Sequence, residues 1–254
     1  MSIRARRWLF VVCGAALFTI FILAVRELPQ FGHYRGPYGD VLNRETVYER
    51  HATDVVSAVN FDWRGIDTLG EESILFLSVV GTIVLLRTGD AEVQGKDKED
   101  ARPNADIPLP SEATRVATLG LVGPLVVFGL YIVTHGHLTP GGGFQGGVVL
   151  ATAPLLVYVA GDLKTFKRIA NHQFVEIMEA LGIGGFLGIG FLGMAVRGAF
   201  LRNVLPLGTT GHLFSGGTIL VLNVFTGAAV AAGMLSVMYA FLEHTIEVRL
   251  RSKA

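Results

Sequence analysis

VATLGLVGPLVVFGLYIVT, residues 116–134, is a run of 19 residues without a charged side chain. An α-helix rises about 1.5 Å per residue, so this run matches the roughly 30 Å thickness of a bilayer's hydrocarbon core. Five more apolar windows occur along the chain, at residues 8–25, 72–86, 144–160, 174–196 and 213–242. The pattern predicts an all-α, polytopic membrane protein with six transmembrane helices.

The composition excludes several other classes of protein. Of 254 residues, 51% are hydrophobic and 17% are charged, against about 25% charged in a soluble domain. The 21 basic and 21 acidic residues balance, so the charge gives no argument for nucleic acid or another anionic partner. The single cysteine, Cys13, cannot form an intrachain disulfide or a cysteine metal cluster. A soluble enzyme, a nucleic-acid binder and a disulfide scaffold are all disfavoured.

The distribution of basic residues predicts the orientation of the helices. If the N-terminus is cytoplasmic, 14 Lys and Arg residues lie inside and 7 lie outside. Such an excess follows the positive-inside rule and predicts that both termini face the cytoplasm. The first window is longer than the apolar region of a signal peptide and no clear cleavage site follows it, so we expect a retained helix.

A polar segment divides the chain into two expected modules. TGDAEVQGKDKEDARPNADIPLPS, residues 88–111, is rich in charge and contains three prolines, which is typical of a linker. We therefore expect a two-helix module at 1–88, a cytoplasmic linker at 89–111 and a four-helix module at 112–254. The external segment of the first module should contain a short helix near 46–60. The two modules should share little contact, because other subunits are expected between or around them.

HGHLTPGGGFQGG, residues 135–147, is the most distinctive segment. A P-loop is excluded because neither a Lys-Ser/Thr pair nor a preceding strand is present. Two histidines without a nearby carboxylate or thiol form a weak metal site, so the favoured interpretation is a tight turn that lets two helices pack closely. The candidate motif residues are His135, His137, Pro140, Gly141, Gly142 and Gly143. A similar GHLFSGG at 211–217 lacks similarity in its flanking helices and is interpreted as a coincidence.

FDWRGIDTLGEE, residues 61–72, is the second candidate segment. Thr68 and Glu71 have the spacing of a capping box directly before an apolar run, which predicts a helix start there. Asp62, Arg64 and Asp67 could form ion pairs at the membrane edge. The mixed chemistry of the segment also suits a contact with another protein.

Two acids near the start of the fifth window are candidates for a proton or ion relay. Glu179 lies about two turns inside the helix and Glu176 about one turn, so Glu179 is the better candidate. The alternative for both is a favourable interaction with the helix N-terminus. Asn223 is expected to bond a neighbouring helix. The small residues Ala180, Gly184 and Gly188 form a stripe that indicates a close helix neighbour.

Enzymatic function is not expected. The sequence has no G-x-S-x-G or H-E-x-x-H motif, and no cysteine nucleophile with a suitably placed histidine. The histidines at helix ends argue against haem, so we expect neither a cofactor nor a metal.

HGHLTPGGGFQGG and the later GDLK, residues 161–164, resemble the MnhB/MrpB subunit of multisubunit sodium/proton antiporters. They also resemble the homologous subunit of membrane-bound, gas-evolving hydrogenases. RELPQFG at 26–32 and FDWRGIDTLGEESILF at 61–76 resemble the MbhE-type subunit and the C-terminal part of MrpA, although Trp63 stands where that family more often has tyrosine or phenylalanine.

This resemblance implies a non-catalytic subunit of a multisubunit Na⁺/H⁺ antiporter. Its expected partners are other membrane subunits, Na⁺ and H⁺ as transported ions, and the lipid bilayer of a prokaryotic cell membrane. Two alternatives stay open: the equivalent subunit of a hydrogenase-type, redox-driven complex, and a scaffold subunit with no part in conduction.

Overall fold

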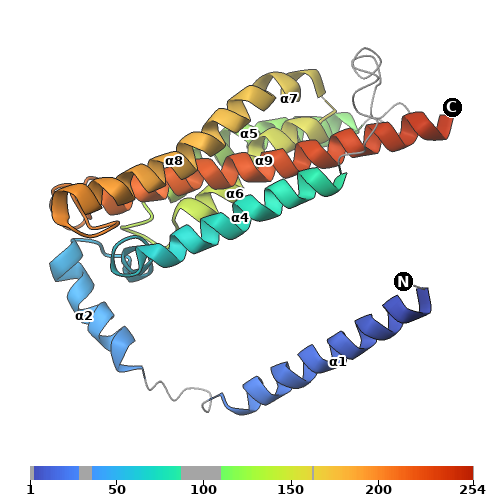
Figure 1. Cartoon of the computed structure of the whole chain (residues 1–254). Coiled ribbons are helices and arrows are strands. Elements are labelled where there is room, and N and C mark those ends of the chain that lie inside the picture. Colours follow the sequence, from blue (N-terminus) through green and yellow to red (C-terminus); the bar gives the residue numbers. More distant parts are fainter. Residues whose placement is uncertain (1–2, 29–35, 87–109, 162, 254) are drawn as a thin grey trace. The chain divides into compact units, whose positions relative to one another are not determined.

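The computed structural model of the chain describes residues 3–28, 36–86, 110–161 and 163–253, and these residues form helices and connecting loops without a strand (Figure 1). Residue contacts divide the chain into two units, Met1–Val41 and Leu42–Ala254. The expected all-α class of a polytopic membrane protein is confirmed, since five of the described helices are long and apolar enough to cross a membrane.

The first unit is dominated by the apolar helix α1, Ile3–Arg26. All of its described side chains are exposed, including Trp8 and Phe10 at 70% and 80%. A helix with that composition and exposure is suited to lipid or to the apolar face of another protein.

The second unit contains the end of α2 and all the helices after it. Helix α2, Pro37–Arg50, begins in the first unit and continues into the second. The order then continues with α3, Val55–Ala58; a short π-helix η1, Val59–Trp63; α4, Gly65–Leu86; α5, Glu112–Thr134; α6, Gly143–Val159; α7, Leu163–Ile169; α8, His172–Arg197; and α9, Thr218–Lys253. The predicted short helix near 46–60 is confirmed, because the end of α2 and all of α3 lie in that range.

Local sequence explains several helix starts. The Asp54 side chain accepts a hydrogen bond from the Ser57 amide at 2.6 Å and so caps α3. Ser111 accepts from the Thr114 amide and caps α5, and Asn171 accepts from the Gln173 amide and caps α8. Small polar side chains at these positions satisfy amides that have no partner inside the helix.

Helix α9 is the centre of the second unit, because α4, α5, α6 and α8 all pack against it. Helix α8 approaches the backbone of α9 closely at Gly182, where an added Cβ would meet the backbone of Ala229. By contrast, at Gly184 and Gly188 of the predicted stripe no atom of another described element lies within 4 Å of such a Cβ. The stripe therefore lies on the outer surface of α8, and a different small-residue position makes the internal contact.

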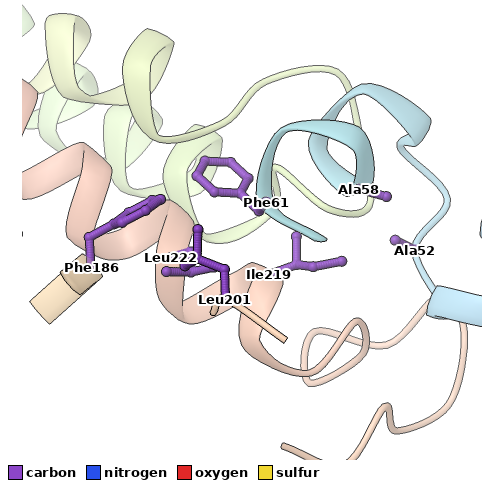
Figure 2. Close-up of a cluster of buried hydrophobic side chains, with 7 residues drawn as sticks. All are labelled: Ala52, Ala58, Phe61, Phe186, Leu201, Ile219 and Leu222. Carbon is purple, nitrogen blue, oxygen red and sulfur yellow. The ribbon is translucent and has the colours of Figure 1, made fainter. Parts of the chain in front are cut away.

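The main hydrophobic core joins the two expected modules (Figure 2). Phe61, 3% exposed, packs against Phe186 of α8 with ring centroids 6.3 Å apart. The buried residues of this core are Ala52, Ala58, Phe61, Phe186, Leu201, Ile219 and Leu222. The expectation that the modules share little contact is wrong, because Ala52, Ala58 and Phe61 of the first module form one core with residues of α8, α9 and the loop between them.

The boundaries of two apolar windows differ from the helices. The window at 72–86 needed extra length, and α4 supplies it by starting at Gly65. The window at 213–242 begins too early, because Gly216 and Gly217 have positive φ angles of 73° and 60° and α9 starts only at Thr218. Helix α6 has 17 residues, at the lower limit for crossing a bilayer.

Candidate functional site

The PGGGF turn, residues 140–144, connects α5 to α6 and holds α6 against α9. Gly141 and Gly142 have φ angles of 158° and 133°, and Gly142 is the residue that precedes the first turn of α6. The Gly143 amide donates a hydrogen bond to the Asn223 side-chain oxygen of α9 at 2.8 Å. Pro140 is exposed at the outer edge of the turn. The interpretation as a tight turn that allows close helix packing is confirmed.

The two histidines of this motif have different surroundings. His135 is half-buried and its ring stacks on Tyr131, with centroids 4.3 Å apart. His137 is fully buried, and its carbonyl accepts hydrogen bonds from the amides of Thr53 and Asp54 at 3.0 and 3.1 Å. Among the described residues, no group of three or more histidine, cysteine, aspartate or glutamate side chains could hold a metal ion.

Burial lowers the pKa of the His137 imidazole, and the backbone of His212 and Leu213 opposes that shift. His137 is therefore neutral in the folded chain over more of the pH range than an ordinary histidine. The backbone of His137 fastens the segment after α2 to the loop between α5 and α6.

The FDWRGIDTLGEE segment does not start a helix where the capping box placed it. Helix α4 begins at Gly65, so Thr68 lies within its first turn and is 1% exposed. The Thr68 hydroxyl donates to the Asn60 carbonyl at 2.6 Å, and Glu71 is exposed. The capping-box prediction is wrong because the short helices before Gly65 lead almost directly into α4.

The predicted ion pairs of this segment are confirmed. Arg64 and Asp67 lie 2.7 Å apart on the surface. Asp62 is more deeply placed, with 8% of its side chain exposed, and accepts from Arg50 at 2.7 Å. The Arg50 guanidinium also lies 4.0 Å from the centre of the Trp63 ring, in a cation–π contact.

Asp62 also connects this segment to the start of α9. The Asn203 amide nitrogen donates to Asp62 at 3.2 Å, and the Asn203 oxygen accepts from the Thr218 amide at 3.1 Å. Asn203 thus caps α9 and holds the Asp62 carboxylate at the same time. No local pattern of residues points to this pairing, because 141 residues separate the partners.

A second polar cluster is buried between α4 and α9. Glu72 is 3% exposed, and its Oε1 atom accepts a hydrogen bond from the Thr226 hydroxyl at 2.6 Å. One turn away, the Asn223 amide nitrogen donates to Ser57 at 2.9 Å and to the Ile219 carbonyl at 3.0 Å. The predicted bonding of Asn223 to neighbouring elements is confirmed. Glu72 was not singled out from the sequence, although an acid at the start of an apolar window was a usable signal.

The two relay candidates of α8 lie near a cavity at the other end of α4. Glu176 is exposed and lies 3.1 Å from His172, with both side chains more than 60% exposed. Glu179 is half-buried and faces Ser236 of α9. The cavity has a volume of about 130 Å³ and is lined by Ile83, His172, Val175, Glu176, Glu179, Ser236, Tyr239 and Ala240. Glu179 therefore has polar neighbours, whereas Glu176 is mainly turned to the surface.

The chain is similar to a known family and to proteins of several organisms. Residues 113–236 match a family model described as a domain related to the MnhB subunit of Na⁺/H⁺ antiporters. An uncharacterized protein of Methanocaldococcus jannaschii is 32% identical over 200 residues, which cover 70% of this chain and 73% of that protein. A Na⁺/H⁺ antiporter subunit of Alkalihalophilus pseudofirmus is 35% identical over 88 residues, or 35% of this chain and 58% of that protein.

A solved structure resembles almost the whole chain. It is one chain of the membrane-bound sulfane sulfur reductase, an archaeal respiratory membrane complex, with a TM-score of 0.71 and 29% identity. The similarity covers 94% of this chain and 98% of that one. Together with the family model, which spans the region from α5 into α9, these matches show that the chain belongs to the MnhB family.

Proposed function

We propose that the chain is a non-catalytic membrane subunit of a multisubunit monovalent cation/proton antiporter that exchanges Na⁺ for H⁺. The observation that carries this proposal is the match of residues 113–236 to the antiporter-related MnhB model. The similarity to a named Na⁺/H⁺ antiporter subunit supports it independently. Within such a complex the chain contributes to ion translocation and to assembly.

Buried acids support the part in ion translocation. Glu72 and the half-buried Glu179 lie on α4 and α8, which are long and apolar enough to cross a membrane, and both have hydroxyl neighbours on α9. Ionisable groups inside a membrane are costly and usually functional. The second of these acids, Glu179, is the proposed relay of the cytoplasmic half, and Glu176 is its more exposed neighbour.

Exposed apolar surfaces support the part in assembly. Helix α1 has no buried side chain among its described residues, and the outer face of α8 carries Ala180, Gly184 and Gly188, with open space beside both glycines. Small residues allow another membrane helix to approach closely. We propose that other membrane subunits, together with lipid, cover these surfaces, and that Asp67 and Glu71 lie at the rim of such a contact.

The proposed topology has six spans with both termini in the cytoplasm of a prokaryotic cell. It counts the 17-residue α6 as a span and comprises a module at 1–88, a linker at 89–111 and a module at 112–254. Cysteine accessibility from the two sides of the membrane tests it. A cysteine at an exposed position of α2, such as Tyr48, should react with an impermeant reagent only from outside.

Deletion of the chain from the intact complex tests the function. Inverted membrane vesicles with the full set of subunits should show Na⁺-dependent proton exchange, and vesicles without this chain should show none. Restoring the chain from a plasmid should restore exchange. Full exchange in its absence would contradict the proposal.

A second candidate is the equivalent subunit of a redox-driven, ion-pumping complex. It is supported by the similarity of both expected modules to one chain of the sulfane sulfur reductase complex. Purification of the complex through a tag on this chain separates the two candidates. Copurified iron–sulfur or nickel proteins identify a redox complex, whereas their absence beside antiporter subunits identifies an antiporter.

A further inference from the structure

Glu72 combines deep burial with an incomplete set of partners. Its side chain lies between α4 and α9 and is 3% exposed. Oε1 accepts a hydrogen bond from Thr226, but the buried Oε2 atom has no hydrogen-bond partner among the described residues. A carboxylate normally has several acceptor positions filled when it is removed from water.

The hydrogen-bond partner of Glu72 is neutral. Thr226 donates to Glu72 from α9, and Asn223, one turn before Thr226 on the same helix, donates to Ser57 of α3. Among the described residues, no lysine, arginine or histidine forms an ion pair with Glu72. An isolated buried negative charge is strongly unfavourable, so such a carboxylate binds a cation or a proton.

We infer that Glu72 is a binding site for a small monovalent cation, H⁺ or Na⁺, in the seam between α4 and α9. The inference rests on the proposed function, because an exchange complex needs groups that bind its ions reversibly within the membrane. It assigns that task to a residue of the first module, whereas the family model covers only the second.

The contacts between α4 and α9 lead from Glu72 to the cavity beside Glu179. One face of α4 presents Glu72 to Thr226, then Leu75 and Val79 to Gly233, and finally Ile83 to the Glu179 cavity. The order of contacts is the same on both helices, so α4 and α9 run parallel. Eleven residues of helix separate Glu72 from Ile83, which is about 16 Å. The seam therefore contains two acids at different depths, separated by an apolar contact.

A purely structural Glu72 makes a different prediction. In that case its task is to accept the hydrogen bond from Thr226, and a glutamine at position 72 performs it equally well through its amide oxygen. A cation site, however, needs the ionisable group. Glu72→Gln therefore separates the two roles while it retains the size of the side chain and the bond to α9.

Labelling with dicyclohexylcarbodiimide tests cation binding directly. This apolar reagent reacts with protonated carboxyl groups in a membrane, and mass spectrometry of peptides locates the adduct. In membranes that contain the full complex without Na⁺, we expect an adduct on Glu72 and none on Glu45, whose side chain is 41% exposed on α2. An unmodified Glu72 overturns the inference.

A Na⁺ titration of the same reaction distinguishes the two cations. If added Na⁺ but not choline protects Glu72, the site binds Na⁺ in competition with H⁺, and if neither protects it, the site binds H⁺. The labelling experiment does not depend on transport. If the antiport assay alone fails, the proposed function is refuted, but the evidence for a cation site at Glu72 is unchanged.

Transport by the variants completes the test. We expect Glu72→Gln to assemble with the other subunits but to lose exchange to the level of vesicles without the chain, and Glu45→Gln to retain it. Normal exchange by Glu72→Gln overturns the inference. If Glu72→Gln fails to assemble, labelling of the wild-type complex still decides, because it requires no variant.

Discussion

Substitution of Gly143 by alanine measures how much the close approach of α6 and α9 contributes to stability. A Cβ at this position would lie 2.5 Å from the Asn223 carbonyl oxygen and 2.6 Å from the Thr226 Cβ. Ordinary contacts begin near 3.4 Å, so the two helices must separate by about 0.9 Å. Such overpacking typically costs about 1–3 kcal/mol. The φ angle of Gly143 is in the normal range for alanine, so the substitution adds no backbone strain.

The matched control is Gly120→Ala on α5, where nothing lies within 4 Å of an added Cβ. Alanine is the better helix former by roughly 1 kcal/mol, so this variant should equal or exceed the wild type in stability. Thermal unfolding of the full-length chain in detergent, followed by loss of the monodisperse peak, provides the measurement. Equal stability of Gly143→Ala and the wild type, or equal damage by both substitutions, would refute the packing argument.

Three further predictions concern single ionisable groups. Asp62→Ala removes the mostly buried partner of Arg50 and should destabilise the chain by about 1.5–3 kcal/mol. Its control, Glu45→Ala on the surface, should change stability by less than about 1 kcal/mol. Thermal unfolding measures both. The lowered pKa of His137 means that the unfolded chain binds more protons, so stability should fall as the pH drops from the ordinary histidine pKa towards the folded value. His137→Gln should reduce the dependence of the free energy of unfolding on pH between pH 5 and 7.5, roughly the range in which histidine titrates. An unchanged dependence in this variant would mean that other groups cause it. Glu179→Gln should impair exchange without loss of assembly, because Glu179 is half-buried in the wall of the cavity beside Ser236. Glu176→Gln should impair exchange less, because Glu176 is mainly exposed. Loss of assembly by Glu179→Gln would make the role of Glu179 structural.

Features encoded in short segments could be predicted from the sequence. The apolar windows located the long helices, since about 20 consecutive apolar residues have few other uses. The PGGGF turn was interpretable because three glycines after a proline allow a conformation that other residues avoid. Arg64 and Asp67 are three residues apart in the sequence, so their ion pair depends on local geometry alone.

Features that depend on the packing of distant segments could not be predicted. Glu71 and Glu72 are adjacent and chemically identical, yet one is exposed and the other is 3% exposed. Only the position of α9 distinguishes them, because successive residues of a helix point about 100° apart. The joint core of the modules was missed for the same reason. Phe61 lies in a segment with no apolar periodicity, and its partner Phe186 is 125 residues later in the sequence.

The same joint core has a consequence for how the protein is made. Thr53 and Asp54 donate to the His137 carbonyl, and Thr226 donates to Glu72, so the two halves of the chain bind each other directly. Two separate polypeptides, cut between α4 and α5, should therefore still find each other in the membrane. Joining them in one gene fixes their ratio at one to one and raises the concentration that each half presents to the other. The covalent link then governs stoichiometry and the speed of assembly, while the contacts at the core govern which surfaces meet.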